Sequence, residues 1–269
     1  MSRMTKYFLL AVGGVFLLGA TSGCGVLRLY DKLQARNELN EGVKAYSSQK
    51  YDQAIEHFKA SVARDPQLVD AQLYLATAYR AQFVPGSQSL GNLQMAKQAI
   101  SAFEVVLEID PKNTSSLASI AGIHNSMGDY ENAKVWYRKQ LEADPTNPEP
   151  LYAFGTINWQ LSYDKTGMTG ENVEYLTEEE NAEVTQLIDE GIGVLKEAIE
   201  IRPGYTEAMQ YLNLLYREKG KLATEEEEKQ NWELEADKLA LEALEMKRKQ
   251  EEEAEQARRT ISGAVKKEE

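Results

Sequence analysis

The sequence predicts an all-α fold, an α-solenoid of about five stacked helix hairpins closed by a long C-terminal helix. The first observation behind this prediction is a short phrase, "EIDPKN" at 108–113, that the chain repeats with variation. Variants stand at 63–68, 142–147 and 200–205. Pro111 and Pro145 lie 34 residues apart, and the other proline spacings, 45 and 58 residues, are this period with insertions. A fixed period of this length is typical of repeat architectures, and each proline ends the helix before it.

The second observation is a recurring pair of side-chain sizes. Twelve residues before each of the four prolines stands a small residue, and eight before stands a bulky apolar one. The small residues are Ala54, Ala99, Ala133 and Gly191, and the bulky ones are Phe58, Phe103, Tyr137 and Leu195. The first helix of each expected pair also carries a small residue, at Gly42, Ala76, Ala121 and Gly155. Small residues let two antiparallel helices approach closely, and bulky residues one turn away fill the next groove.

This pattern resembles the tetratricopeptide repeat (TPR) over roughly residues 35–222. The third unit carries it most fully, at Ile120, Ala121, Gly128, Tyr130, Ala133, Tyr137 and Pro145. The fourth unit departs from it, because Gly191 stands where alanine is usual. One such repeat cannot bury its apolar face alone, so neighbouring units must stack. The resemblance implies a TPR-type α-solenoid.

The recurring prolines and the small and bulky positions predict the order and the bounds of the helices. The expected pairs are 35–48 with 51–64, 69–82 with 93–109, 114–127 with 130–143, 148–161 with 178–201, and 206–219 with a long helix from 225. Thr177 with Glu180, and Thr224 with Glu227, have the spacing of capping boxes that open helices.

The last helix is expected to close the array. An apolar stripe follows one helical face and predicts a closing helix over 223–247 that packs on the fifth unit. Its members are Trp232, Ala236, Leu239, Ala243 and Met246. Residues 248–269 are densely charged and predict a solvated tail, frayed or disordered, with a coiled-coil partner as the alternative.

The N-terminal sequence predicts export. Arg3 and Lys6 precede an uncharged apolar run over 7–20, the pattern of a secretory signal peptide. Cys24 is the chain's one cysteine, so it cannot form an intramolecular disulfide. It follows a run of small residues. The arrangement resembles the bacterial lipoprotein signal, which implies a signal peptide over 1–23, lipidation at Cys24 and a tether over 24–34. An uncleaved membrane anchor and plain secretion after Ala20 are the alternatives.

All three readings place the repeats outside the cytoplasmic membrane, because basic residues precede the apolar run. By resemblance to lipoprotein sorting, Gly25 favours the outer membrane, facing the periplasm, over the inner membrane. The chain carries a formal net charge of −13, which disfavours nucleic acid and anionic lipid as partners of the surface at large. The lipid anchor is therefore expected to hold the protein to its membrane.

No residue pattern points to catalysis. His57 and His124 are the two histidines, and both are expected to pack or to lie at the surface. Zinc, phosphate-loop, calcium-loop and nucleophile-elbow motifs are missing from the sequence. We therefore expect a protein that is not an enzyme and that uses neither metal nor cofactor.

The resemblance to TPR proteins implies a concave wall lined by the first helix of each pair. Its positions are Leu39, Val43, Tyr46, Leu73, Thr77, Arg80, Ala118, Gly122, Asn125, Tyr152, Thr156, Trp159, Gln210, Leu214 and Arg217. The candidate partner-binding residues among them are Arg80, Asn125, Tyr152, Thr156, Trp159 and Arg217, since aromatic and arginine side chains favour binding hot spots. Packing between repeats is the alternative role for the tyrosine and tryptophan. The family's chaperone-tail receptors grip a carboxylate at positions that here are mainly Leu39, Val43, Tyr74, Ser115 and Ser119, so that clamp is absent.

Two insertions interrupt the period, at 83–92 and 162–177. Loops of this length tend to be functional, although surface decoration is the alternative. Both fall between the two helices of a hairpin, so we expect them on one edge of the stack. Phe83, Tyr163 and Tyr175 are the candidate anchors of this loop surface.

These features together favour a membrane-tethered, extracytoplasmic scaffold that binds a protein or peptide partner in a bacterial cell envelope. The alternatives are a non-catalytic accessory subunit of an envelope enzyme or secretion machine, and a binder of small ligands or glycans. The sequence sets no oligomeric state.

Overall fold

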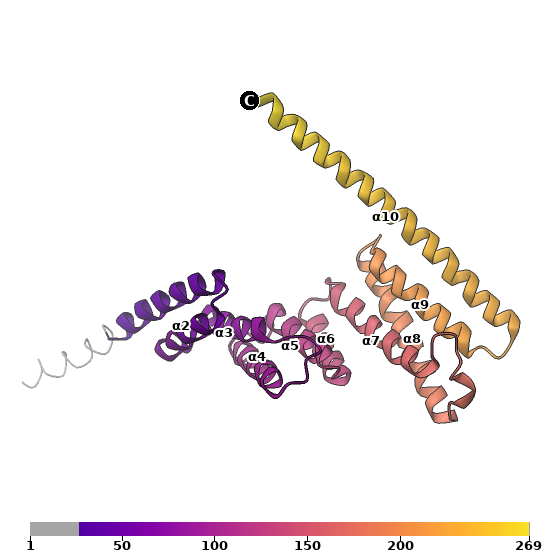
Figure 1. Ribbon diagram of the computed structural model, residues 1–269, viewed down its shortest axis with the longest axis horizontal. Coiled ribbons are helices and arrows are strands. Elements are labelled where there is room, and N and C mark those ends of the chain that lie inside the picture. The colour runs from indigo at the N-terminus through magenta and orange to yellow at the C-terminus, as the bar shows by residue number, and fades with distance from the viewer. Residues whose placement is uncertain (1–26, 269) are drawn as a thin grey trace, which may run out of the picture. The chain divides into compact units, whose positions relative to one another are not determined.

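The computed structural model describes residues 27–268, with side chains placed for 27–258, and it is built from helices joined by turns and loops (Figure 1). The predicted signal peptide and the predicted lipidation site at Cys24 lie outside the described residues. The chain divides into two compact units, Met1–Gly128 and Asp129–Glu269.

The first unit contains five helices among its described residues. Residues 27–47 form the first of them. The others are α2 (Tyr51–Arg64), α3 (Val69–Gln82), α4 (Leu90–Ile109) and α5 (Thr114–Ser126). Contacts hold the first helix against α2, where the Ser61 hydroxyl donates to the Ala35 carbonyl at 2.7 Å and His57 Nδ1 lies 2.9 Å from Glu38 Oε2. These contacts make the first two helices a hairpin, and they place His57 at its surface.

The second unit continues the series. Its elements are α6 (Tyr130–Ala143), α7 (Glu149–Thr166), the short 3-10 helix η1 (Val173–Tyr175), α8 (Glu178–Ile201), α9 (Thr206–Leu222) and α10 (Glu226–Glu268). Within this unit α7 packs on α8, α8 on α9, and α9 on α10 (Figure 1).

The recurring prolines end helices as expected. α2, α4, α6 and α8 each stop two residues before Pro66, Pro111, Pro145 and Pro203 respectively. The residue before each proline is the C-cap, with ψ between 87° and 90°. Proline's ring disfavours helical geometry at this residue, so the turn between units is fixed locally.

The alternation of small and bulky residues fixes the spacing of the paired helices, as predicted. Phe58 of α2 fills the space above Gly42, where an added Cβ would lie 2.4 Å from Phe58 Cε1. Leu195 of α8 fills the space above Gly155 of α7, again at 2.4 Å. The alanines at the equivalent positions, Ala54, Ala76, Ala99, Ala121 and Ala133, are all fully buried.

Several helices extend beyond their expected ends. The first helix already includes residues 27–34, which the sequence analysis assigns to a tether. α4 begins at Leu90 rather than residue 93, because the Ser89 side chain accepts a hydrogen bond from the Asn92 N–H and caps the helix there. α7 continues to Thr166 rather than residue 161 and ends at Gly167, whose φ of +83° suits glycine.

Of the two predicted capping boxes, one is confirmed. Thr177 accepts from the Glu180 N–H at 3.2 Å, while the Glu180 carboxylate accepts from the Thr177 N–H at 3.1 Å. The other is wrong by one residue, because α10 begins at Glu226 and the Glu225 carbonyl accepts from the Lys229 N–H. A box based on Thr224 requires the helix to start at Glu225.

The long helix α10 closes the second unit, as predicted. Ala236 and Ala243 are buried against α9, the Asn213 amide donates to the Ala236 carbonyl, and the Trp232 ring lies 5.5 Å from that of Tyr216. The Gln250 amide still reaches the Gly204 carbonyl at 3.0 Å. Beyond it, residues 251–258 are exposed, although the helix continues to Glu268. No helix among residues 27–268 is long and apolar enough to cross a membrane.

Candidate partner-binding groove

A groove of about 430 Å³ opens in the first unit, where the first helices of three successive hairpins lie next to one another. Its lining residues come from the helix of 27–47, from α3 and the loop after it, and from α5. They are Tyr46, Thr77, Arg80, Ala81, Phe83, Pro85, Gly122, Ile123, Asn125 and Ser126. Five of them belong to the concave wall that the TPR resemblance implies, so the predicted wall forms a real concavity here.

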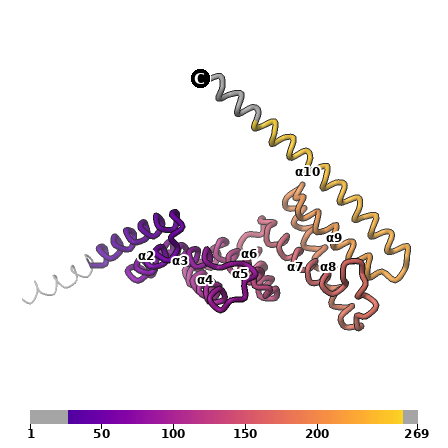
Figure 2. The backbone as a smooth tube through the Cα atoms, viewed as in Figure 1, coloured from indigo at the N-terminus to yellow at the C-terminus, as the bar shows by residue number. Residues whose placement is uncertain are grey.

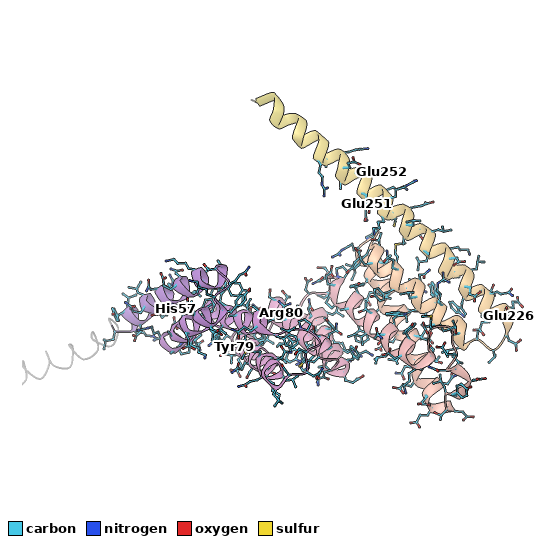
Figure 3. The ribbon with its side chains drawn as sticks, viewed as in Figure 1. His57, Tyr79, Arg80, Glu226, Glu251 and Glu252 are labelled. Carbon is cyan, nitrogen blue, oxygen red and sulfur yellow. The ribbon has the colours of Figure 1, made fainter. Side chains whose placement is uncertain are left out.

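Arg80, which is labelled in Figure 3, is the only charged residue among those that line the groove. Its side chain is exposed, and no ion pair with it occurs among residues 27–258. The rest of the lining is neutral, with the amide of Asn125 and the hydroxyls of Tyr46 and Ser126 beside apolar side chains. A guanidinium free of an internal partner can bind a carboxylate through two parallel hydrogen bonds. The groove is therefore suited to a mixed ligand with a negative group.

The chain between α3 and α4 can be followed in Figure 2, and Phe83 and Pro85 of this loop line the groove. Asn92 holds the loop. Its side-chain oxygen accepts from the Val84 N–H at 2.7 Å, and its amide donates to the carbonyls of Val84 and Ser87 at 2.9 and 2.8 Å. Asn92 itself is only 8% exposed. These bonds satisfy backbone groups that a loop otherwise leaves to water.

The prediction that Phe83 is an exposed loop anchor is wrong. Phe83 is only 9% exposed, and its N–H donates to the Arg80 carbonyl at the end of α3. Phe83 and Pro85 line the same groove as Arg80 and Asn125. In this unit the loop and the concave wall, which the sequence analysis treats as separate candidate surfaces, form one site.

The aromatic candidates Tyr152 and Trp159 lie in the second unit, on α7, and their rings contact α9 and its N-cap residue. The ring of Tyr211 lies 5.6 Å from Tyr152 and 5.3 Å from Trp159, and Tyr152 also lies 5.3 Å from Tyr205. Burial raises the pKa of the Tyr152 hydroxyl, and burial together with a hydrogen bond to Glu149 raises that of Tyr205. This geometry favours the packing role for both rings.

The other two wall candidates in this unit are also engaged. Thr156 donates to the Ala153 carbonyl of its own helix at 2.7 Å. Arg217 pairs with Asp237 of α10 at 2.7 Å and donates to Asn213 at 3.3 Å. Of the six predicted partner-binding residues, the structure thus brings Arg80 and Asn125 together in a groove. Tyr152, Thr156 and Trp159 share one helix, and Arg217 belongs to the contact of α9 with α10.

The second insertion forms a loop over 167–177. Tyr163 is not part of it, because α7 continues to Thr166; its ring packs on Trp159 at 5.3 Å and lies 5.1 Å from Lys221 Nζ. Its assignment to a loop surface is therefore wrong. Tyr175, in η1, is 76% exposed and remains a candidate anchor. Each insertion belongs to a different unit, so their placement on one edge stays a prediction.

This second loop is held by charged groups that the sequence analysis does not single out. Lys221 donates to the Gly167 carbonyl and to Glu218, both at 2.7 Å, and Glu218 accepts from the Thr166 hydroxyl at 2.6 Å. Glu171 accepts from the N–H groups of Met168 and Thr169 at 3.2 and 2.7 Å. Hydrogen bonds from the backbone N–H groups of Glu171 itself and Thr169 lower the pKa of the Glu171 carboxyl to about 2.

Some of these loop-holding residues have a recognisable signal in the sequence. Ser89, a residue type favoured at the N-cap just before a helical run, marks a helix start, and Gly167 after a helical run marks a helix end. The pairing of Glu218 with Thr166 has no local signal, because it joins residues 52 positions apart. Within residues 27–258, no group of three or more His, Cys, Asp or Glu side chains is placed to hold a metal ion.

The fold and the groove define the class of protein: a TPR-type α-solenoid whose first-helix positions line a concavity. Residues 114–147 match the family model of the tetratricopeptide repeat. The chain therefore contains at least one repeat of this family, and the match falls on the third repeat, where the pattern is fullest.

Solved structures show the same fold over most of the chain. A crystal structure of MamA covers 80% of this chain and 94% of its own, with a TM-score of 0.57 and 17% identity. MamA 41-end from Desulfovibrio magneticus RS-1 covers 81% and 97%, with a TM-score of 0.55 and 16% identity. YrrB, described as a TPR protein with an unusual peptide-binding site, covers 77% and 84%, with a TM-score of 0.50 and 14% identity.

Curated relatives match a smaller part. The Hsp70-Hsp90 organizing protein of Triticum aestivum is 28% identical over 122 residues, which is 45% of this chain and 19% of that protein. Hsp70-Hsp90 organizing protein 3 of Arabidopsis thaliana is also 28% identical over 122 residues, or 45% and 20%. The match thus spans about a fifth of the length of these relatives.

Proposed function

We propose that the groove around Arg80 binds a segment of a protein partner and that the chain acts as a non-catalytic scaffold. The observation that carries this proposal is the guanidinium of Arg80, which has no ion pair among residues 27–258 and lies in a concavity of about 430 Å³ whose other lining residues are neutral. The volume accommodates a few side chains of an extended segment. The relatives support this class of function, since their names describe organizing and peptide-binding proteins.

The ligand we propose is a peptide segment with one carboxylate next to apolar side chains. The carboxylate pairs with Arg80, Asn125 bonds to the peptide backbone, and the apolar side chains contact Pro85 and the exposed edge of Phe83. The chaperone-tail clamp is not part of this proposal. The positions equivalent to it by resemblance offer two apolar side chains, a tyrosine and two serines: Leu39, Val43, Tyr74, Ser115 and Ser119.

The location we propose is the bacterial cell envelope, outside the cytoplasmic membrane. The support is the sequence pattern of a basic start, an apolar run over 7–20 and Cys24. Lipidation of Cys24 then tethers the scaffold, and Gly25 favours the outer membrane, facing the periplasm.

Site-directed photo-crosslinking tests the groove. A crosslinking amino acid at Asn125 is expected to capture one partner from envelope extracts, and the same probe at the exposed Lys112 is not. Arg80→Gln is expected to abolish the Asn125 crosslink, because the partner's carboxylate loses its counter-charge. Arg64→Gln, an equal change at an exposed arginine of α2, serves as the control. A crosslink that survives Arg80→Gln contradicts the proposed site.

Metabolic lipid labelling tests the tether. Cys24→Ser is expected to abolish incorporation of labelled fatty acid into the protein. Undiminished labelling of this variant would show that the lipid, if any, is attached elsewhere.

A further inference from the structure

The N-terminal end of the first helix exposes an apolar surface. Ala35 is the first fully buried residue of this helix, and residues 27–33 before it are all exposed. Leu27, Leu29, Tyr30 and Leu33 are 65%, 61%, 56% and 60% exposed. Four large apolar side chains within seven residues form a patch rather than isolated surface hydrophobics.

The hairpin cannot cover this patch. Each residue of an α-helix is rotated by about 100° from the one before, so Leu33 points about 160° away from Ala35. Ala35 faces α2, since its carbonyl accepts from Ser61. Leu29 and Tyr30 lie on the same side as Leu33, within about 60° of it. The face formed by Leu29, Tyr30 and Leu33 is therefore turned away from the face with which the same helix packs.

The patch is bordered by positive charge. Arg28, Lys32 and Arg36 follow one another at helical spacing of four, and Asp31 is the only acidic residue between 27 and 36. This segment carries +2 in a chain of net charge −13. Within the described residues, none of its three basic side chains forms an ion pair. Leucine and tyrosine flanked by lysine and arginine are the composition of helices that lie at a lipid surface.

The chain places this segment a few residues after the apolar run of 7–20 and Cys24. We propose that residues 27–36 form an interfacial helix that lies in the headgroup layer of a bilayer containing anionic lipid. Leu29, Tyr30 and Leu33 enter the acyl boundary, while Lys32 and Arg36, within about 100° of Leu33 around the helix, meet the lipid phosphates. This inference rests on the proposed membrane tether, and it gives the helix a second attachment. It also reverses, for this segment, the expectation that the acidic chain avoids anionic lipid.

Local fluorescence on the full-length chain tests the proposal. An environment-sensitive fluorescent amino acid replaces Tyr30, and the protein is reconstituted into vesicles of phosphatidylethanolamine and phosphatidylglycerol at 3:1. The matched control carries it at the exposed Asn40, on the same side as Leu33 and about 10 Å further along the helix. We expect blue-shifted emission at position 30 and quenching by brominated lipid about twofold or more above that at position 40.

Two variants separate the contributions. Leu29→Gln with Leu33→Gln is expected to abolish the shift while leaving circular dichroism unchanged, because both side chains are exposed. Lys32→Gln with Arg36→Gln is expected to remove the difference between these vesicles and vesicles of pure phosphatidylcholine.

Vesicle flotation separates this proposal from the tether. If the chain floats with vesicles but position 30 stays as water-exposed as position 40, the interfacial helix is overturned and the tether stands. If the chain does not float and no shift occurs, both are overturned. A blue shift without vesicles that grows with protein concentration assigns the patch to a second copy of the chain and overturns the lipid surface. Photo-crosslinking at Asn125 tests partner binding in the groove, and its result does not depend on any of these three outcomes.

Discussion

Two glycines of α8, two residues apart, have opposite surroundings. A Cβ added at Gly191 would lie 2.7 Å from Leu215 Cδ1 and 3.1 Å from Asn158 Cβ, whereas one added at Gly193 would meet no atom within 4 Å. Gly191 thus sets the distance between α8 and its neighbours α7 and α9. Gly193 is exposed and only lowers the helix propensity of α8.

This contrast gives a prediction for stability. Gly191→Ala is expected to lower the free energy of unfolding by about 1–3 kcal/mol through overpacking. Gly193→Ala is expected to raise it by about 0.5–1 kcal/mol, because alanine loses less backbone entropy in a helix. Urea unfolding followed by circular dichroism measures both. Changes of the same sign would mean that α8 and α9 are not as close as the structure shows.

Glu171 makes the second loop sensitive to acid. Its folded-state pKa of about 2 lies below the ordinary glutamate value, so the folded loop favours the ionised carboxylate. The stabilisation is fully present above the ordinary pKa and is lost as the pH falls towards about 2. We expect Glu171→Gln to speed proteolysis at 167–171 at pH 7, and NMR titration of the wild type to give a midpoint near 2 for this carboxyl. A midpoint near 4 would show that the bonds to Met168 and Thr169 do not persist in solution.

At the scale of the element, the ends of the helices divide into those that local chemistry sets and those that distant contacts set. The ends before Pro66, Pro111, Pro145 and Pro203 follow from the proline ring alone, so the sequence predicts them. The repeat period predicts that α7 ends at residue 161, whereas the helix continues to Thr166 and ends before Gly167. Where an insertion interrupts the repeat period, a helix-ending residue such as glycine predicts the end of a helix better than the period does.

The start of α8 offers a test of capping. Thr177→Ala removes both hydrogen bonds of the threonine hydroxyl, including the one it accepts from the Glu180 N–H, and is expected to cost about 1 kcal/mol of unfolding free energy. Glu183→Ala, at an exposed position of the same helix, is the control and is expected to change it by less than about 0.5 kcal/mol. Thermal unfolding compares the two. Equal melting temperatures would assign the start of α8 to packing rather than to its cap.

The candidate site was predictable to the extent that it follows the repeat. Arg80 and Asn125 occupy periodic positions on first helices, so the TPR resemblance finds them from sequence. The burial of Phe83 depends on how Asn92 folds the loop back, and no spacing encodes this. Arg217 occupies an equivalent periodic position, but α10 lies beside it and supplies Asp237 as its partner. The repeat period predicts the helix position of a side chain. Contacts with distant parts of the chain decide whether that side chain can still bind a partner.

At the scale of the whole molecule, α10 has two parts with different roles. Up to Gln250 it covers α9, with Ala236 and Ala243 buried, and from residue 251 to 258 it is exposed (Figure 3). A chain ending after Gln250 is expected to melt within about 2 °C of the full chain, because only exposed residues are lost. A chain ending after Glu225 is expected to melt more than about 10 °C lower, since the surface of α9 becomes exposed. Scanning calorimetry distinguishes the two, and equal melting temperatures would show that α10 does not close the unit.

The hydrogen bonds of Asn92 also bear on the thermodynamics of partner binding. Fixing the backbone of a free loop costs about 1–2 kcal/mol per residue, and a binding site with such a loop must meet this cost each time a ligand enters. In this protein folding has already fixed the loop, because Asn92 holds the backbone at Val84 and Ser87 in the absence of a ligand. Binding therefore does not carry this entropy cost. Asn92→Ala should therefore weaken partner binding mainly through a less favourable entropy, with the enthalpy of the Arg80 contact preserved. Isothermal titration would separate the two quantities, and it would show whether the groove owes its affinity to contacts or to rigidity.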